Sequence, residues 1–282
     1  MKIGVSSYSF SQYLRSGKLD LLSVIQKAAD MGFEGIEYTD LPGDTFEERK
    51  ALAEQIKAEA AKCGIELTAY VVSGGLLCDT QEEQDAVIAR IKTNLDLAAV
   101  LGVKLFRYDP IYKMPHLMSY DEAVRRIAPA MRQIAEYGEK LGIMTMSENH
   151  GLIFQDYDRV EKLYDAINHP NYSLLIDIGN FLCADVDNVM CVSRLAHLAS
   201  HVHLKDFIKV GFHEDHEGCF ATRACNYLKG VAVGDGDAQT AQCLAILEKA
   251  GFDGYADIEY EGHEDCIEGL AKGIAYFKSL YQ

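Results

Sequence analysis

The sequence lacks any long apolar run. No stretch approaches the roughly 20 consecutive apolar residues that a membrane-spanning helix needs, and the N-terminal MKIGVSSYSF becomes polar too early for a secretory signal peptide. The eight cysteines contain no CxxC pair, which indicates free thiols in a reducing compartment. We therefore expect a soluble, cytoplasmic protein that does not bind membranes.

Basic residues are scarce. Lys and Arg together number 27 against 43 Asp and Glu, which gives a formal net charge of −16. A chain this acidic is poorly suited to the phosphate backbone of nucleic acid or to an anionic membrane surface. A small-molecule partner is the remaining expectation, and the sequence leaves open whether the protein forms a homo-oligomer.

What the sequence does contain is a regular alternation of short apolar runs and long amphipathic stretches. A glycine precedes several of the runs ("DMGFEGIEY", "KCGIELTAY", "VLGVKLFRY", "KLGIMTMSE"), where it fits the left-handed end of a helix. The runs predict eight strands, at residues 2–6, 35–38, 66–72, 104–107, 144–148, 173–177, 201–205 and 255–260.

Eight strand-then-helix units of roughly 30 residues predict a (β/α)8 TIM barrel, which typically takes about 250 residues. We expect residues 1–282 to form this single domain. The alternative is a doubly wound open sheet, which would place a glycine-rich phosphate loop after the first strand. That position reads VSSYSFSQY, which is not such a loop.

One segment, residues 206–233, interrupts the alternation because it shows no clean periodicity. Long irregular connections in compact domains are usually functional lids or disordered, and we expect this one to form a lid over the barrel. It carries an HxxHxxC pattern, which resembles a small zinc site only weakly because no second tight pair follows. A lid in which His213 contacts the substrate is the preferred interpretation. The four residues concerned are His213, His216, Cys219 and Cys225.

Polar residues end the last four predicted strands. These are Glu148, Asp177, His203 and Glu259. Singly, such a residue is more often a solvated flank or an ion-pair partner than a ligand, but catalytic groups of barrel enzymes sit at the carboxyl ends of the strands. Three carboxylates and one imidazole suit one divalent ion such as Mn²⁺, Mg²⁺, Co²⁺ or Zn²⁺. The pattern therefore predicts a metal site at this rim.

The motifs "MSENHG", "LLIDIGNF", "HVHLKDF", "GVAVGDGD" and "DIEYEG" resemble those of the sugar phosphate isomerase/epimerase superfamily, the xylose isomerase-like TIM barrels. The resemblance covers nearly the whole chain. It implies that Glu148, Asp177, His203 and Glu259 bind one divalent metal ion that chelates a small sugar, keto-sugar or cyclitol and stabilises an enediolate. Glu148 and Glu259 would be the catalytic pair that moves the proton, as in an isomerase or epimerase.

The chain departs from the ketose 3-epimerase branch of this superfamily at three positions. Asn180, Phe154 and Lys209 stand where those enzymes have His, Glu and Arg, so 3-epimerisation of a free ketose is disfavoured. Lys205 in "HLKDF" is instead similar to inosose dehydratase-like members, which implies a keto-sugar lyase as the alternative. Lys205 and His150 are candidates for substrate contact or acid–base work, with hydrogen bonding to nearby carboxylates as the structural alternative. Asn180 and Lys209 are further candidates for substrate contact.

Two further residues, Tyr8 and Arg107, lie at or just after the ends of predicted strands at the same rim, and two other functions are less favoured. Tyr8 could wall a sugar face, and Arg107 could bind an anionic group of the substrate or neutralise neighbouring acids. An abasic-site endonuclease would need several metal ions, more His ligands and a basic face, which this acidic chain does not offer. A barrel that binds without turnover is disfavoured because all four ligand positions are present.

Overall fold

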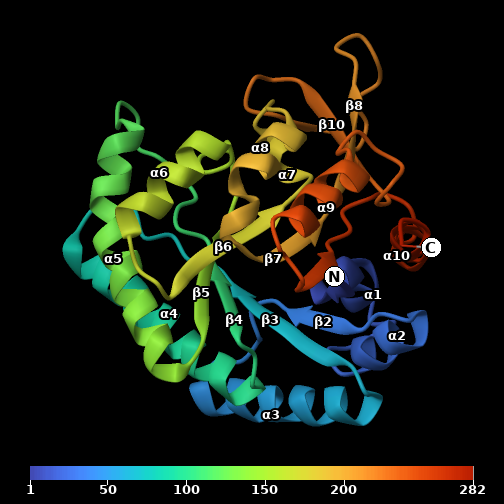
Figure 1. The fold of residues 1–282 in the computed structure, drawn as a ribbon. Coiled ribbons are helices and arrows are strands. Elements are labelled where there is room, and N and C mark those ends of the chain that lie inside the picture. The colour runs from blue at the N-terminus through green and yellow to red at the C-terminus, as the bar shows by residue number, and fades with distance from the viewer. Residues whose placement is uncertain (282) are drawn as a thin grey trace.

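Eight parallel strands close into a barrel in the computed structural model, which describes residues 1–281 (Figure 1). The order around the barrel is β1-β11-β7-β6-β5-β4-β3-β2, so every strand lies beside its neighbour in the chain and β11 closes onto β1. The predicted barrel is thus confirmed, with strand ends within two residues of those expected. The strands are β1 (Lys2–Ser6), β2 (Gly35–Tyr38), β3 (Glu66–Val72), β4 (Leu105–Tyr108), β5 (Met144–Glu148), β6 (Tyr172–Asp177), β7 (Ala199–Leu204) and β11 (Tyr255–Ile258).

Helices surround the barrel on its outer face (Figure 1). The side chain of Thr45 caps the helix that begins at Phe46 by accepting from the backbone N–H of Glu48, in a capping box. Gly64, Gly102 and Gly142 end successive helices with positive φ, where a side chain would be strained. The helices are α2 (Ser23–Met31), α3 (Phe46–Cys63), α4 (Gln81–Leu101), α5 (Tyr120–Leu141), α6 (Tyr157–Ile167), α8 (Asn188–Leu195), α9 (Thr240–Lys249) and α10 (Cys266–Ser279), with shorter turns η1 (Ser7–Phe10), α1 (Ser11–Arg15), α7 (Asn180–Cys183) and η2 (Ala196–Leu198).

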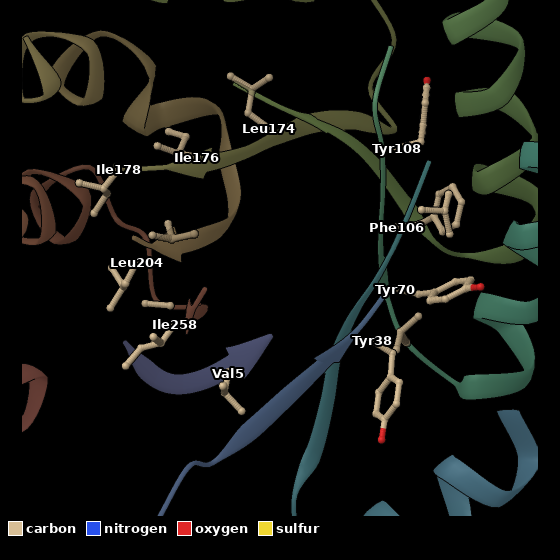
Figure 2. Packing of buried hydrophobic residues seen from close by; sticks show 14 of the residues in the cluster. Val5, Tyr38, Tyr70, Phe106, Tyr108, Leu174, Ile176, Ile178, Leu204 and Ile258 are labelled. Carbon is tan, nitrogen blue, oxygen red and sulfur yellow. The ribbon is translucent and has the colours of Figure 1, made fainter. Parts of the chain in front are cut away.

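Most of the core lies between the strands and the helices. Tyr38, Tyr70, Phe106 and Tyr108 project from β2, β3 and β4 toward the surrounding helices (Figure 2). The residues that alternate with these along each strand point into the barrel, because successive side chains of a strand lie on opposite faces. A second small cluster of Val71, Met146 and Leu175 fills part of the barrel interior. Leu105 and Met144 pack against this second cluster.

The connection between β7 and α9 is not irregular, contrary to the sequence-based expectation. It forms a three-stranded antiparallel sheet in the order β8-β10-β9, built from β8 (Asp206–Val210), β9 (Phe220–Ala221) and β10 (Tyr227–Val231). Figure 1 shows β8 and β10 projecting beyond the barrel. We refer to residues 206–231 as the β8–β10 sheet; its role as a lid stays a prediction.

The base of this sheet is tied down by one buried carboxylate. Asp206 accepts hydrogen bonds from the backbone N–H groups of Gly234, Gly236 and Ala238, at 3.0 to 3.1 Å. These glycines belong to the "GVAVGDGD" motif, so the backbone of this motif holds the first residue of β8 in place. Within residues 1–281, no helix has the length and apolar character to cross a membrane.

Candidate metal centre

The four predicted metal ligands meet at one end of the barrel. Glu148 and Asp177 end β5 and β6, His203 lies near the end of β7, and Glu259 follows β11; one ligand atom from each lies within 4.8 Å of all the others. Nδ1 of His203 is 3.6 Å from Oε2 of Glu259 and 4.0 Å from both Glu148 Oε1 and Asp177 Oδ2. The side chain of Glu259 is 14% exposed and the other three are buried, so the cluster opens toward solvent at Glu259.

Two buried atoms in the cluster have no hydrogen-bond partner among residues 1–281. They are Oδ2 of Asp177 and Nδ1 of His203. The other oxygen of Asp177 accepts from the backbone N–H of Asn180 at 2.9 Å, and Asn149 bonds both the N–H and the carbonyl of Asp177. Leaving a buried polar atom unpaired is costly, and a divalent ion held by three carboxylates and one imidazole would satisfy both atoms. The donor set therefore fits the predicted ion.

The carboxylates of the cluster strongly influence one another. Burial, together with the nearby charges of Glu148 and Glu259, outweighs the effect of Lys205 and raises the pKa of Asp177 to about 7. Burial also disfavours the charged form of Glu259, but Lys205 and His203 hold the pKa of that carboxyl well below its usual value. A nearby positive charge is thus needed to keep these carboxyl groups ionised while they are buried together.

Two buried cations lie against the cluster, at positions that the sequence singled out. Nζ of Lys205 is 2.5 Å from Oε2 of Glu259 and 3.4 Å from Oδ2 of Asp177. Burial disfavours the ammonium form, yet Glu259 and the other surrounding acids raise the pKa of Lys205 well above its ordinary value. Nη2 of Arg107 is 2.6 Å from Oε2 of Glu148 and 2.7 Å from Oδ1 of Asp109.

The remaining rim candidates divide into two groups. Asn180 donates from Nδ2 to Oε1 of Glu148 at 2.7 Å, and Nδ1 of His150 is 3.0 Å from Oδ1 of Asp109. Burial works against a charged imidazole, but Asp109 and Glu148 raise the pKa of His150 above its ordinary value. Tyr8, His150, Asp109 and Glu148 line a pocket of about 380 Å³, which we call the central pocket, and Asn180 does not.

Two further substrate-contact candidates lie elsewhere. Lys209 is exposed on β8, and His213 is exposed in the turn after it, and neither lines the central pocket. Direct substrate contact by either one stays a prediction. The zinc pattern is not supported: no potential ligand cluster within residues 1–281 includes His213, His216, Cys219 or Cys225. His216 instead stacks on Tyr227, with ring centroids 3.5 Å apart.

Sequence reasoning missed a polar network beneath the cluster. Oε2 of Glu37 on β2 is 3.0 Å from Nε2 of His203 and 3.4 Å from Nε2 of His201. His201 also lies 3.2 Å from Oδ2 of Asp257, which accepts from Thr68 Oγ1 at 2.6 Å. The alternation in "HVH" and "DIE" was the available signal, because it puts His201 and Asp257 on the same face as His203 and Glu259.

Known proteins resemble this chain over nearly its full length. The sequence profile of the xylose isomerase-like TIM barrel family matches residues 25–280. An inosose dehydratase of Mesomycoplasma hyopneumoniae is 24% identical over 94% of this chain and 90% of its own.

Two solved structures share the fold. The 3-keto-D-glucoside 4-epimerase of E. coli superposes with a TM-score of 0.74 at 15% identity, over 99% of both chains. The IOLI protein with a binding zinc atom superposes with a TM-score of 0.77 at 15% identity, over 99% of this chain and 98% of that one. At such identity, these two likenesses concern the fold alone.

Proposed function

Because the chain belongs to the xylose isomerase-like TIM barrel family, we propose that it is a divalent-metal-dependent enzyme that removes water from a small keto-sugar or keto-cyclitol. Glu148, Asp177, His203 and Glu259 would hold the ion. Two buried atoms without a hydrogen-bond partner in the described part of the chain, Oδ2 of Asp177 and Nδ1 of His203, support this assignment. The IOLI protein, which shares the fold, is described with a bound zinc atom, and this is consistent with metal binding by the present barrel. When bound, the ion supplies a Lewis acid that polarises a carbonyl oxygen and makes the neighbouring C–H more acidic.

Glu259 is the better placed of the two glutamates to take the proton. Both oxygens of Glu148 are engaged, one with Asn180 and the other with Arg107. Glu259 contacts Lys205 and faces His203 through Oε2 alone, and its side chain is the most exposed of the four. A carboxylate oxygen at the pocket surface is what proton abstraction from a bound sugar requires.

The observation that favours dehydration is the Lys205 ammonium 2.5 Å from Glu259. Glu259 takes the proton from the carbon next to the carbonyl, the C–O bond to the β-hydroxyl breaks, and Lys205 gives its proton to the departing oxygen, so that water leaves. Lys205 then recovers a proton from Glu259 across the short contact, which returns both residues to their starting states. The name of the inosose dehydratase relative supports the same reaction class.

Isomerisation or epimerisation is the second candidate, and it shares the first step. Glu148 and Glu259 lie on two sides of His203 in the barrel, at 4.0 and 3.6 Å from its Nδ1. If Glu148 exchanged its contact with Arg107 for the substrate, it could return a proton to the opposite face or to the next carbon. The two candidates therefore differ in whether a hydroxyl leaves.

The experiment that separates them follows Mn²⁺-loaded protein with keto-sugars and keto-inositols in deuterated water. We expect loss of one water by mass spectrometry, and we expect Lys205→Met to slow that loss by about 10²-fold or more while some deuterium exchange persists. Lys229→Met, which removes an exposed lysine of β10, is the matched control and should behave as wild type. Exchange with formation of an isomer and no loss of water would favour the second candidate. No exchange in any of these substrates would contradict both.

A further inference from the structure

A second pocket opens beside the central pocket. It has a volume of about 220 Å³, and His150, Lys205 and Glu261 line both pockets. We call it the side pocket. These three residues form the boundary between the two pockets, so a molecule bound at the metal centre would reach the side pocket by passing over them.

The outer wall of the side pocket is apolar and aromatic. Phe220 of β9 is 38% exposed, and its ring packs edge-on against the buried Phe207, with centroids 5.2 Å apart and an interplanar angle of 75°. Leu152, Cys183 and Ala221 add further apolar surface. The central pocket, in contrast, is lined mainly by charged groups. An exposed aromatic beside such a pocket is suited to cover the apolar face of a ring.

This wall is held in place by Arg223, which follows β9. Its Nε donates to the carbonyl of Leu152 at 2.8 Å, its Nη1 lies 2.7 Å from Oδ1 of Asp156, and its backbone N–H donates to the carbonyl of Cys183 at 2.9 Å. Leu152 has a φ of 64°, in the left-handed region that non-glycine residues rarely adopt. These contacts join the β8–β10 sheet to the loop after β5, so the side pocket is preformed.

The charges around both pockets disfavour an anionic occupant. Lys205 is committed to Glu259 and also lies 3.4 Å from Oε1 of Glu261, and Arg107 is committed to Asp109 and Glu148. Glu261 itself adds a carboxylate to the side pocket. A phosphate or carboxylate would therefore find no unpaired Lys or Arg side chain among the residues that line the side pocket. An anionic occupant is therefore disfavoured, and the aromatic wall favours an uncharged one.

We infer that the side pocket binds a neutral ring with an apolar face, joined by a glycosidic bond to the keto-sugar that reacts in the central pocket. This ring is either a second sugar or an aromatic aglycone. The inference rests on the proposed function for the reacting sugar and adds that the substrate is a keto-glycoside. The three residues that line both pockets place the two rings next to each other, which supports a bond between them. The exposed aromatic ring of Phe220 supports a ring with an apolar face as the occupant of the side pocket.

Calorimetric titration of Mn²⁺-loaded protein tests the inference with the methyl, phenyl and glucosyl glycosides of one hexose. The hexose carries a free ketone on a ring carbon other than the anomeric carbon, so the glycosidic bond leaves the carbonyl intact. We expect the phenyl or the glucosyl glycoside to bind about tenfold more tightly than the methyl glycoside, because only these place a ring on Phe220. The ligand that gains affinity identifies the ring. Phe220→Ala should bring this affinity ratio close to one. Phe212→Ala removes an aromatic that is 73% exposed in the turn of the same sheet, and it should leave the ratio unchanged.

A second variant covers the case in which Phe220→Ala fails to fold. Ala221→Trp fills the side pocket from an exposed position and should also bring the ratio close to one. A ratio near one in wild type, or a ratio that survives in a folded Phe220 or Ala221 variant, overturns the inference. Deuterium exchange of the methyl glycoside, measured in parallel, reports on the proposed function separately. Deuterium exchange with an affinity ratio near one would refute the role of the side pocket alone. An affinity ratio well above one without deuterium exchange would refute the proposed reaction alone.

Discussion

Nε2 of His203 lies 3.0 Å from Oε2 of Glu37, a fully buried carboxylate on β2. The contact fixes the ring so that Nδ1 faces Glu148, Asp177 and Glu259. A histidine that binds a metal through one nitrogen commonly donates from the other to a carboxylate, which orients the ring and makes it a better ligand. Glu37 is therefore a positioning residue for the proposed metal centre.

Glu37 is itself held from below. Burial disfavours its charged form, but His203 and His201 lower the pKa of Glu37 to about 2. His201 connects Glu37 to Asp257, and Asp257 accepts from Thr68, so the network crosses the barrel from β3 to β7. TIM barrel interiors are usually filled by layers of branched apolar side chains. The polar layer here, which we call the polar floor, lies beneath the proposed metal ligands and contacts them through Glu37 and His203.

Glu37→Gln should weaken metal binding. An amide in place of the carboxylate removes the charge that holds the His203 ring, and loss of such a partner typically costs about 10- to 100-fold in metal affinity. Titration of the metal-free protein with Mn²⁺ or Zn²⁺ by calorimetry measures the change. Glu136→Gln, an exposed site on α5, is the control. Wild-type affinity in Glu37→Gln would show that the network does not support the metal centre.

His203→Ala should remove the ion itself. The purified protein is expected to carry about one divalent ion per chain after dialysis against Mn²⁺, because the four ligands form one compact set. Elemental mass spectrometry of wild type and His203→Ala gives the stoichiometry. His197→Ala removes an exposed histidine and should leave it unchanged. One ion per chain retained by the His203 variant would place the metal elsewhere.

The stability of the metal-free protein should fall at alkaline pH because of His201. Burial disfavours its charged form, but Asp257 and Glu37 raise the pKa of His201 from 6.5 to about 9. A raised pKa contributes stability that is fully present below about pH 6.5 and is lost as the pH rises through about 9. The loss is on the order of 3 kcal/mol at most.

Urea unfolding in the presence of a chelator, at about pH 6.5 and about pH 9.5, measures this loss as a change in the free energy of unfolding. His201→Gln lacks the titrating group, so its unfolding free energy should change less between the two pH values. An equal change in wild type and variant would show that other groups cause the alkaline loss.

The sequence was sufficient for the barrel because helix caps and strand ends are local signals. Thr45 with Glu48 marks the start of α3, and Gly64 marks its end, independently of the rest of the chain. The side chains of Glu148 and Asp177 could be placed at one rim because parallel strands of a barrel end on the same side. These inferences need only the order of the strands.

The β8–β10 sheet and the polar floor need more than strand order. β9 is only two residues long and both are exposed, so the sequence there has no alternation of apolar and polar residues that would predict a strand. Glu37 and His203 are 166 residues apart, and their contact depends on β2 and β7 facing one another across the closed barrel. Such cross-barrel contacts depend on the register of the strands, which short apolar runs do not specify.

Gly4 on β1 leaves room for the polar floor, and Gly4→Ala should disrupt it. A Cβ at this position would overlap Oδ1 of Asp257 and would lie 3.2 Å from the carbonyl oxygen of Gly35. Asp257 cannot easily move away, because its other oxygen accepts from Thr68 and faces His201. We expect a loss of about 1 to 3 kcal/mol in the free energy of unfolding, as for other overpacked cores.

The cause of that loss can be isolated with a double-mutant cycle. Asp257→Ala removes the carboxylate that the added methyl group would strike, so Gly4→Ala should cost less in the Asp257→Ala background than in wild type. Gly211→Ala is the matched control, because a Cβ there meets only the side chain of the exposed Glu214. Equal costs of Gly4→Ala in both backgrounds would mean that the contact with the Gly35 carbonyl, rather than the polar floor, requires glycine on β1.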